Sequence, residues 1–197
     1  MEEGVYTTMR PQAVIIAGPN GAGKTTASRG LLPPGVEYVN ADLIAQRLAR
    51  RSDAPGELEA MRMELAEIDR LVAVRESFAV ETKLAPRAFE KRIAEWKAAG
   101  YRVTLFFVYL SDPEQSVRRV RQRVLNGGHD VPEAVVRRRY EEGLRNFFGC
   151  YRPLVDEWQF LDNSEVETKL VASSSIIGEV WVENPLLWSE LESGYSP

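Results

Sequence analysis

The sequence contains almost no cysteine or histidine. Cys150 is the only cysteine and His129 the only histidine among 197 residues. An internal disulfide is therefore excluded, which is typical of proteins in a reducing compartment. A lone histidine beside Asp130 gives no cluster of metal ligands, so we predict no zinc-type metal centre.

The chain also lacks a long apolar run and an excess of positive charge. Its longest apolar run, residues 103–110, is far too short to cross a bilayer, and the first ten residues contain no apolar core of a signal peptide. With 25 Lys and Arg against 29 Asp and Glu, the net charge is −4. This balance argues against general nucleic-acid binding by the whole surface. We therefore expect a cytoplasmic protein whose partners include neither membrane nor nucleic acid.

Short apolar runs alternate with longer helical patterns along the chain. This alternation predicts an α/β fold with a parallel sheet. Strands are expected at residues 13–17, 36–39, 77–80, 103–110 and 158–161. Helices are expected at residues 24–32, 41–49, 57–75, 86–99, 113–125 and 133–148. The last stretch gives a weaker pattern and no readable function, with an extra strand in 171–177 and a short helix at 184–193.

A glycine-rich turn follows the first expected strand. Residues 18–25 match the phosphate-loop pattern G-x-x-x-x-G-K-[ST] and precede a helix. Glycines let the backbone approach phosphates closely, and the helix N-terminus attracts anions. Lys24 would reach the β and γ phosphates, Thr25 would bind Mg²⁺ and Thr26 would contact the α phosphate. We predict an ATP and Mg²⁺ site formed by Gly18, Pro19, Asn20, Gly21, Ala22, Gly23, Lys24, Thr25 and Thr26.

The chain lacks the second motif of motors and GTPases. In those proteins an apolar strand usually ends directly in an aspartate that holds the metal. Here Asp112 lies two residues beyond the strand at 103–110 and precedes Pro113, so it is better explained as a helix cap. A guanine-specifying Asn-Lys-x-Asp motif is also absent. These absences favour a kinase over a motor or a switch.

A carboxylate follows the second expected strand, at the sheet edge where α/β proteins bind ligands. Asp42 comes directly after Asn40 and Ala41. Its carboxylate is suited to accept the proton of an attacking hydroxyl group, the role of a general base. Asn40 and Asp42 equally suit the N-terminus of a helix. On position alone, both interpretations stay open.

Another carboxylate closes the third expected strand. Glu81 and Thr82 follow the apolar residues 78–80. A carboxylate at the end of a buried strand can orient substrate hydroxyl groups or a water on Mg²⁺. The alternative is a strand-end residue that forms an ion pair with Lys83 or Arg87.

Arginines are concentrated on either side of a glycine-containing turn at residues 126–132. Cations on two helices joined by a flexible turn are what a closing lid requires, and guanidinium groups stabilise the charge of a transferring phosphoryl group. Any single arginine is also explained as a surface charge, and a nucleic-acid patch would need stacking aromatics that are absent here. His129, within the turn, either touches substrate in a closed lid or caps the turn. The arginines are Arg118, Arg119, Arg121, Arg123, Arg137, Arg138 and Arg139.

These motifs, in this order, resemble the zeta toxin family of P-loop kinases, and most closely its compact chromosomal members. The similarity covers residues 12 to 164. It is carried by residues 16–26, 39–42, 44–45, 78–82, 100–101, 119–120, 123–124, 127–132, 138–140 and 162–164.

The resemblance implies a fold and a set of roles. The fold is that of P-loop kinases, with a five-stranded parallel sheet and a helical lid over about 118–140. The best-known members phosphorylate UDP-N-acetylglucosamine, so a small-molecule substrate of this kind is implied. By match of motif, Asp42 would be the base, and Lys24 with Arg123 and Arg139 would hold the transferring phosphoryl group. The residues that would face substrate are Glu81, Thr82, Arg119, His129 and Arg138.

The sequence also departs from the family. Members commonly read Glu-Thr-Thr-Leu-Ser at the third strand, whereas this chain has Lys83 and Ala85 at the third and fifth of these positions. The acceptor can therefore differ, and we do not assume toxicity or an antitoxin partner. A non-catalytic ATP-binding module and a nucleic-acid end kinase remain alternatives. We expect a tail at 1–11, a kinase domain at 12–164 and a C-terminal extension at 165–197.

Overall fold

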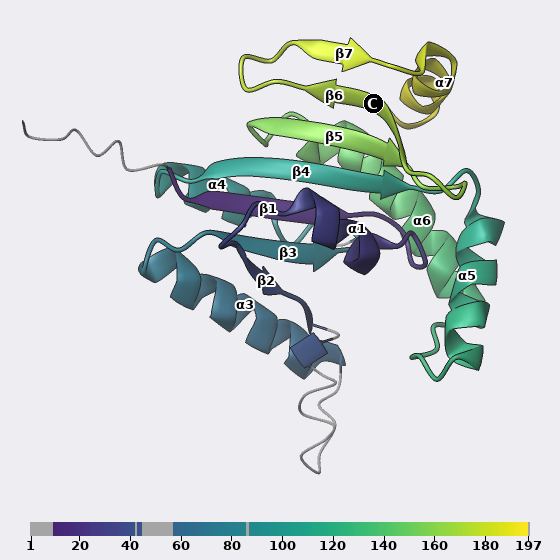
Figure 1. Ribbon diagram of the computed structural model, residues 1–197, viewed down its shortest axis with the longest axis horizontal. Coiled ribbons are helices and arrows are strands. Elements are labelled where there is room, and N and C mark those ends of the chain that lie inside the picture. Colours follow the sequence, from purple (N-terminus) through teal and green to yellow (C-terminus); the bar gives the residue numbers. More distant parts are fainter. Residues whose placement is uncertain (1–9, 42, 45–56, 86, 197) are drawn as a thin grey trace, which may run out of the picture.

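The computed structural model describes residues 10–41, 43–44, 57–85 and 87–196. Its centre is one seven-stranded sheet in the order β2-β3-β1-β4-β5-β6-β7 (Figure 1). The strands are β1 (Gln12–Ala17), β2 (Glu37–Val39), β3 (Phe78–Thr82), β4 (Arg102–Tyr109), β5 (Glu157–Asp162), β6 (Lys169–Ser174) and β7 (Val180–Val182). The predicted α/β class is therefore confirmed.

The sheet contains two strands beyond the five that the family resemblance implies, and the sequence pattern indicated one of these two, in 171–177. β2, β3, β1, β4 and β5 are parallel, as expected. β6 and β7 then continue the same sheet in antiparallel pairings. The five-stranded prediction was wrong because the apolar residues of β7, 180–182, form only a three-residue run, which is too short to give a period-2 pattern. The domain boundary expected at residue 164 thus lies between two neighbouring strands of one sheet.

Helices cover both faces of the sheet. α1 lies on one face, and α4 and α6 lie on the other (Figure 1). The structure has the helices α1 (Lys24–Leu31), α3 (Glu57–Ala73), α4 (Glu90–Ala98), α5 (Pro113–Leu125), α6 (Glu133–Asn146) and α7 (Pro185–Tyr195), and a π-helical turn η1 (Phe147–Tyr151) that continues α6. Most of the helix expected at 41–49 falls outside the described residues. Within those residues, no helix is both long enough and apolar enough to cross a membrane.

Local signals in the sequence explain where two of the helices begin or end. α5 begins after Asp112, whose carboxylate accepts a hydrogen bond from the backbone N–H of Gln115 at 2.8 Å. Asp112 is thus a helix cap, as predicted. α4 ends before Gly100, which has φ +86°, a conformation that favours glycine. α4 begins at Glu90, four residues later than expected.

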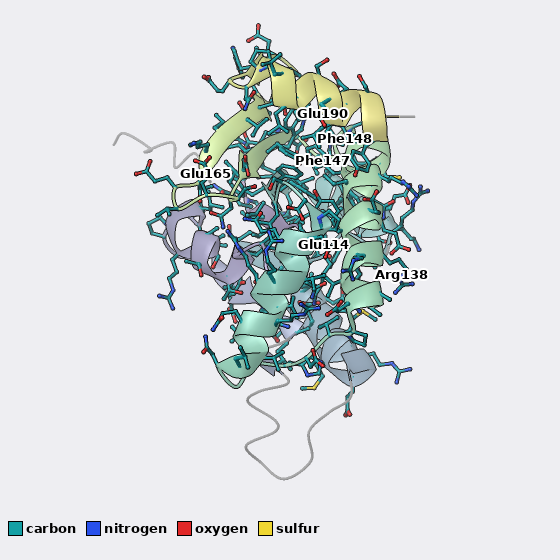
Figure 2. All side chains as sticks on the ribbon, turned by 90° about the vertical axis from the view of Figure 1, so that its right-hand side faces the viewer. Glu114, Arg138, Phe147, Phe148, Glu165 and Glu190 are labelled. Atoms are coloured by element: carbon teal, nitrogen blue, oxygen red, sulfur yellow. The ribbon has the colours of Figure 1, made fainter. Side chains whose placement is uncertain are left out.

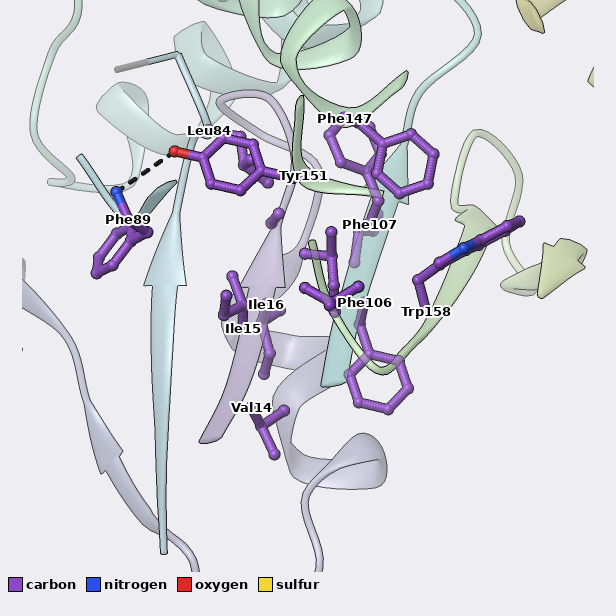
Figure 3. Packing of buried hydrophobic residues seen from close by; sticks show 14 of the residues in the cluster. Val14, Ile15, Ile16, Leu84, Phe89, Phe106, Phe107, Phe147, Tyr151 and Trp158 are labelled. Carbon is purple, nitrogen blue, oxygen red and sulfur yellow. Dashed lines mark hydrogen bonds between the residues drawn. The ribbon is translucent and has the colours of Figure 1, made fainter. Parts of the chain in front are cut away.

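Aromatic side chains fill the core between the sheet and the helices that follow it. Phe107 of β4 packs between Phe147 of η1, with ring centroids 5.0 Å apart, and Phe160 of β5, at 5.2 Å. Figure 3 shows Phe107 and Phe147 beside β1, whose apolar residues are almost fully buried. The Tyr151 hydroxyl group accepts a hydrogen bond from the backbone N–H of Phe89, at 3.4 Å (Figure 3). The core thereby connects η1 to the segment that precedes α4.

The C-terminal helix packs on the same core. Trp188 of α7 stacks on Trp158 of β5, with ring centroids 5.3 Å apart and planes 12° apart. The Arg152 guanidinium group lies over the rings of Phe148 and Trp188 and forms an ion pair with Glu192 at 2.7 Å. The strand and the helix predicted in this segment are both confirmed, and α7 is an integral part of the packing.

Candidate functional site

The glycine-rich turn connects β1 directly to α1. Gly18, Gly21 and Gly23 have φ values of +141°, +78° and +83°, which L side chains rarely adopt. A Cβ on Gly18 would lie only 2.2 Å from the Val108 carbonyl oxygen of the neighbouring strand β4. Glycine is therefore required at residue 18 both by its φ and by the closeness of β4.

Lys24, the first residue of α1 after this loop, is buried. Its ammonium group donates hydrogen bonds to the carbonyl oxygens of Gly18, at 3.0 Å, and of Pro19, at 2.9 Å. Its Nζ atom also lies 3.8 Å from Glu81 Oε1. Two loop carbonyl oxygens thus fix the position of the Lys24 ammonium group. Asn20 is also buried, and its Oδ1 atom has no hydrogen-bond partner in the described part of the chain.

Glu81 brings together side chains from three separate segments. It is next to last in β3, where its backbone is paired with Ile16 of β1. Its Oε2 atom accepts hydrogen bonds from the Thr25 hydroxyl group at 2.8 Å, the Tyr38 hydroxyl group at 2.5 Å and the Asn40 amide at 3.0 Å. One carboxylate oxygen therefore connects the start of α1, the middle of β2 and the residue after β2.

Tyr38 stays protonated in this cluster. Burial, followed by its hydrogen bond to Glu81 and the negative charge of that carboxylate, raises the pKa of Tyr38 to about 12. A phenol with such a pKa remains a hydrogen-bond donor at neutral pH. Tyr38 therefore supplies a fixed donor to Glu81 Oε2.

Asn40 combines a structural contact with a contact in the site. Its Oδ1 atom accepts a hydrogen bond from the backbone N–H of Leu43 at 3.1 Å, which is a helix-cap contact. Its amide nitrogen donates to Glu81 and, at 3.2 Å, to the Tyr38 hydroxyl group. The helix-cap interpretation of Asn40 is therefore confirmed, and its contact with Glu81 is an additional finding. Asp42, the predicted base, lies outside the described residues.

Thr82 is the last residue of β3, and its side chain contacts the turn that follows. Its side chain is buried, and its hydroxyl oxygen accepts a hydrogen bond from the backbone N–H of Leu84 at 3.0 Å. Leu84 has φ +57°, an unusual value for a side chain of this size. The geometry therefore assigns Thr82 a turn contact, and its contact with substrate stays a prediction.

The first half of α5 packs against the phosphate loop. The Arg119 guanidinium group donates hydrogen bonds to the carbonyl oxygens of Gly21 at 3.4 Å, Asn163 at 2.9 Å and Ser164 at 3.4 Å. The Asn163 amide in turn donates to the Ala22 carbonyl oxygen at 2.8 Å. Arg119 thus connects the loop to residues 163–164, which follow β5. Its contact with substrate stays a prediction.

Two of the other arginines join α5 to α6 at the protein surface. Arg137 donates to both carboxylate oxygens of Glu114 at 2.7 Å, and Arg121 forms an ion pair with Glu133. These partners lower the pKa of both glutamates. The helix pair also has a small apolar cluster of its own, formed by Val117, Val120 and Val136 with Val124 and Val131. Residues 113–146 therefore form a well-joined helical hairpin.

The predicted lid residues have different surroundings within this hairpin. Arg123 donates a hydrogen bond to the His129 carbonyl oxygen at 2.6 Å, while the His129 side chain is exposed. Arg138 is exposed and lies on the outer side of α6 (Figure 2), and Arg139 is half-buried. Arg118 lies 3.8 Å from Asp112 in an exposed pair. Lid closure and phosphoryl contacts of these arginines stay predictions.

α6 also fixes the segment that follows Glu81. The buried Asn146 amide donates hydrogen bonds to the carbonyl oxygens of Leu84 at 2.7 Å and Ala85 at 2.8 Å. A Cβ on Gly143 would lie 2.8 Å from the Lys83 carbonyl oxygen. The segment at 83–85 is therefore positioned by backbone contacts with α6, and within the described part of the chain no ion pair joins Lys83 to Glu81.

Sequence reasoning missed Tyr38 and Asn146. Tyr38 is inside an expected strand, where an aromatic residue normally indicates only packing. The signal that could have found it is its spacing, two residues before Asn40, which puts both side chains on the same face of an extended chain. Asn146 could have been noticed as the one amide in the apolar end of its helix.

Comparisons with known proteins agree with this geometry. Residues 14–146 match the AAA domain family. An uncharacterized protein of Haemophilus influenzae is 26% identical over 133 residues, which cover 67% of this chain and 94% of that protein. At this level of identity the relative supports a common fold.

Solved structures have a similar fold. The AvrRxo1-ORF1:AvrRxo1-ORF2 complex with sulphate ions has a TM-score of 0.73 at 20% identity, over 92% of this chain and 63% of that chain. The same complex with ATP has a TM-score of 0.70 at 21% identity, with the same shares of the two chains. This protein thus spans about 63% of the length of that relative.

The PezAT chromosomal toxin-antitoxin system of Streptococcus pneumoniae has a TM-score of 0.57 at 18% identity, over 84% of this chain and 75% of that chain. The predicted resemblance to zeta-toxin-like P-loop kinases is thereby confirmed at the level of the fold. Because the family match covers well over half of the sequence, this chain belongs to the AAA domain family.

Proposed function

We propose that this protein is an ATP-dependent small-molecule kinase that transfers the γ-phosphoryl group of ATP to a hydroxyl group of a metabolite. The observation that carries the proposal is the contact between the Thr25 hydroxyl group and Glu81 Oε2, beside the buried ammonium group of Lys24. A phosphate loop, a cation and a carboxylate meet there at one end of the parallel strands. The structure of the AvrRxo1 complex with ATP supports the choice of nucleotide.

The residues at this point fit a magnesium ion. Thr25 and Glu81 offer oxygen atoms, the ligands that Mg²⁺ prefers, and they are few in number. Among the described residues, no group of three or more His, Cys, Asp and Glu could hold a metal. A small set of protein oxygens suits Mg²⁺ because this ion usually keeps several waters and binds substrate phosphates. When bound, the ion would neutralise negative charge on the phosphates.

The loop and Lys24 would bind the phosphates. Backbone N–H groups of the loop and the N-terminus of α1 attract anions. Lys24 now donates to two loop carbonyl oxygens, and a phosphate oxygen in the loop would give its ammonium group a charged acceptor instead. Arg119 and Asn163 would keep the loop in its shape, because both donate to loop carbonyl oxygens.

The acceptor side of the proposal is based on residue order and on the family resemblance. Asp42, two residues after Asn40, is our proposed base, and Arg123 and Arg139 are the proposed contacts to the transferring group. Thr82, His129 and Arg138 remain proposed substrate contacts. A nucleotide sugar such as UDP-N-acetylglucosamine is the acceptor that the resemblance suggests. A protein partner like those in the toxin-antitoxin and AvrRxo1 complexes is not assumed.

The proposal is tested by incubating the protein with γ-labelled ATP, Mg²⁺ and a metabolite extract. We expect a labelled small molecule whose mass has increased by about 80 Da, the mass of one added phosphoryl group. Glu81→Gln and Lys24→Met should abolish the product, while Lys91→Met, on the exposed face of α4, should not. Nucleotide binding without any labelled product would instead support the non-catalytic binding module.

A further inference from the structure

The last strand of the sheet leaves an apolar edge open. Among the described strands, β7 pairs with β6 alone and comes last in the sheet (Figure 1). Its three residues are all exposed, and Trp181 retains 49% of its accessible surface. This strand lies outside residues 14–146, which match the AAA domain family. Nothing in the proposed phosphoryl transfer explains an exposed Val-Trp-Val strand.

Hydrogen bonding shows which backbone groups face outward from this edge. The Ser175 N–H donates to the Glu179 carbonyl oxygen, and the Glu183 N–H donates to the Val171 carbonyl oxygen, both at 2.9 Å. Residues 179 and 183 therefore direct their backbone groups toward β6. In an antiparallel pair this direction alternates along the strand, so the N–H and C=O groups of Val180 and Val182 point away from the sheet. They offer two donors and two acceptors to an added strand.

The side chains of β7 extend the apolar rows of the sheet. Val182 is paired with Ala172 and Val180 with Ser174, and these in turn are paired with Phe160 and Trp158. Trp188 of α7 packs on Trp158 and Phe160 of β5. Val180 and Val182 lie on this same face of the sheet, each at the outer end of its row of paired residues. An added strand with apolar side chains on this face would bury Val180 and Val182.

The negative charges beside β7 determine which kind of added strand is electrostatically complementary to this edge. Glu179 and Glu183 flank β7, are exposed and point to the same side as Trp181, because side chains alternate along a strand. A second copy paired antiparallel in the fully overlapped register would put Glu179 opposite the other copy's Glu183 at both ends. Like charges directly opposite each other are destabilising, so this edge disfavours its own copy. A segment with a cation at each end is complementary.

We propose that β7 is the docking edge for an extended segment of a partner protein. The segment adds as an eighth strand, with Lys or Arg opposite Glu179 and Glu183 and with apolar residues opposite Val180 and Val182. Main-chain hydrogen bonds give the affinity in this mode, and the alternating side chains give the specificity. The proposal does not depend on the kinase activity.

Trp181 reports directly on this edge. The other three tryptophans, Trp96, Trp158 and Trp188, are buried, whereas Trp181 is half exposed. The test titrates the full chain with the capped peptide Gly-Lys-Val-Thr-Val-Lys-Gly and follows quenching of tryptophan fluorescence by acrylamide. The matched peptide has Glu in place of both Lys residues. We expect the basic peptide to protect Trp181 and to bind about tenfold more tightly than the acidic one, since two attractive pairs replace two repulsive ones.

Charge reversal on the protein provides the control. In the Glu179→Lys/Glu183→Lys double variant the preference should reverse toward the acidic peptide. The Glu95→Lys/Glu167→Lys variant changes the net charge equally at exposed positions elsewhere and should keep the wild-type preference. Equal binding of both peptides, or no protection by either, would overturn the proposal. It would also be overturned by a wild-type dimer in light scattering that Val182→Pro converts to a monomer, because a second copy would then occupy the edge.

Discussion

The Tyr38 hydroxyl group and the Thr25 hydroxyl group donate hydrogen bonds to the same carboxylate oxygen of Glu81, at 2.5 and 2.8 Å. Thr25 is the second residue of α1, the helix after the phosphate loop, whereas Tyr38 belongs to β2, which is separated from β1 by β3. The shared oxygen therefore links the loop to the outer side of the parallel sheet. Tyr38 acts on the site through Glu81, which makes it a positioning residue.

Replacing Tyr38 by Phe removes one donor from Glu81 and keeps the ring. We expect ATP binding without Mg²⁺ to be unchanged, because the Tyr38 hydroxyl group bonds to Glu81 and Asn40 and not to the ammonium group of Lys24. Binding with Mg²⁺ should weaken about tenfold, since a hydrogen bond to a charged group contributes about 1.5–3 kcal/mol. Isothermal titration calorimetry with and without Mg²⁺ measures both affinities.

Tyr195→Phe is the matched control for this substitution. The Tyr195 hydroxyl group also donates to a carboxylate, that of Glu141, at 3.2 Å, but it lies at the end of α7. Its replacement should leave both affinities at wild-type values. Equal loss of ATP binding with and without Mg²⁺ in Tyr38→Phe would contradict a role that acts through Glu81.

Gly18→Ala tests the closeness of the phosphate loop to β4. The new Cβ would lie 2.2 Å from the Val108 carbonyl oxygen, at a φ of +141° that alanine rarely adopts. The loop must move, so we expect loss of ATP binding, measured by calorimetry. Gly30→Ala is the control, because a Cβ at this helical position meets nothing within 4 Å. Gly30→Ala should bind ATP normally and raise the free energy of unfolding by about 0.5–1 kcal/mol.

The sequence was sufficient to predict the parallel strands and the phosphate loop. Continuous apolar runs such as 13–17 and 103–110 indicate strands buried on both faces, and the loop motif has fixed spacing. The helix cap at Asp112 was also predicted, because a cap depends on neighbouring residues. These features share one property: the residues that determine them are close together in the sequence.

The contacts that could not be predicted join distant residues. Asn163 contacts Ala22 across 141 positions, and Arg119 contacts Gly21 across 98 positions. Arginine at position 119 looks the same in the sequence whether it meets substrate or backbone carbonyls. Only the packing of α5 against the loop decides between these partners, and a single sequence carries no signal of that packing.

Gly143→Ala should affect the acceptor side of the site more than the nucleotide side. The new Cβ would lie 2.8 Å from the Lys83 carbonyl oxygen, so the segment after Glu81 must shift. We expect the KM for the phosphoryl acceptor to rise severalfold while the affinity for ATP stays within about twofold of wild type. Steady-state kinetics and calorimetry measure the two effects. Gly194→Ala, on α7 with nothing within 4 Å, should change neither, and an equal effect of both variants would contradict the argument.

The buried tyrosines predict a loss of stability in alkali. Burial raises the pKa of Tyr151 and of Tyr195 to about 12, and it raises the pKa of Tyr140 as well. In the unfolded chain a tyrosine has a pKa of about 10. Above pH 10 the unfolded state loses protons that the folded state keeps, so the free energy of unfolding falls as the pH rises toward 12. Urea titrations between pH 8 and 11.5 should show this fall, and a flat profile would contradict it.

The C-terminal helix should be required for the stability of the whole protein. Trp188 is buried and stacks on Trp158 of β5, so its removal leaves a cavity beside the central sheet. Trp188→Ala should lower the free energy of unfolding by about 3–5 kcal/mol, the usual cost of truncating a large aromatic residue in a core. Leu186→Ala on the same helix should cost almost nothing, because Leu186 is 86% exposed. Chemical unfolding followed by circular dichroism measures both. A single transition shifted to lower denaturant would mean that α7 and the phosphate-loop region unfold together, whereas an unchanged main transition would make residues 165–197 a separate unit.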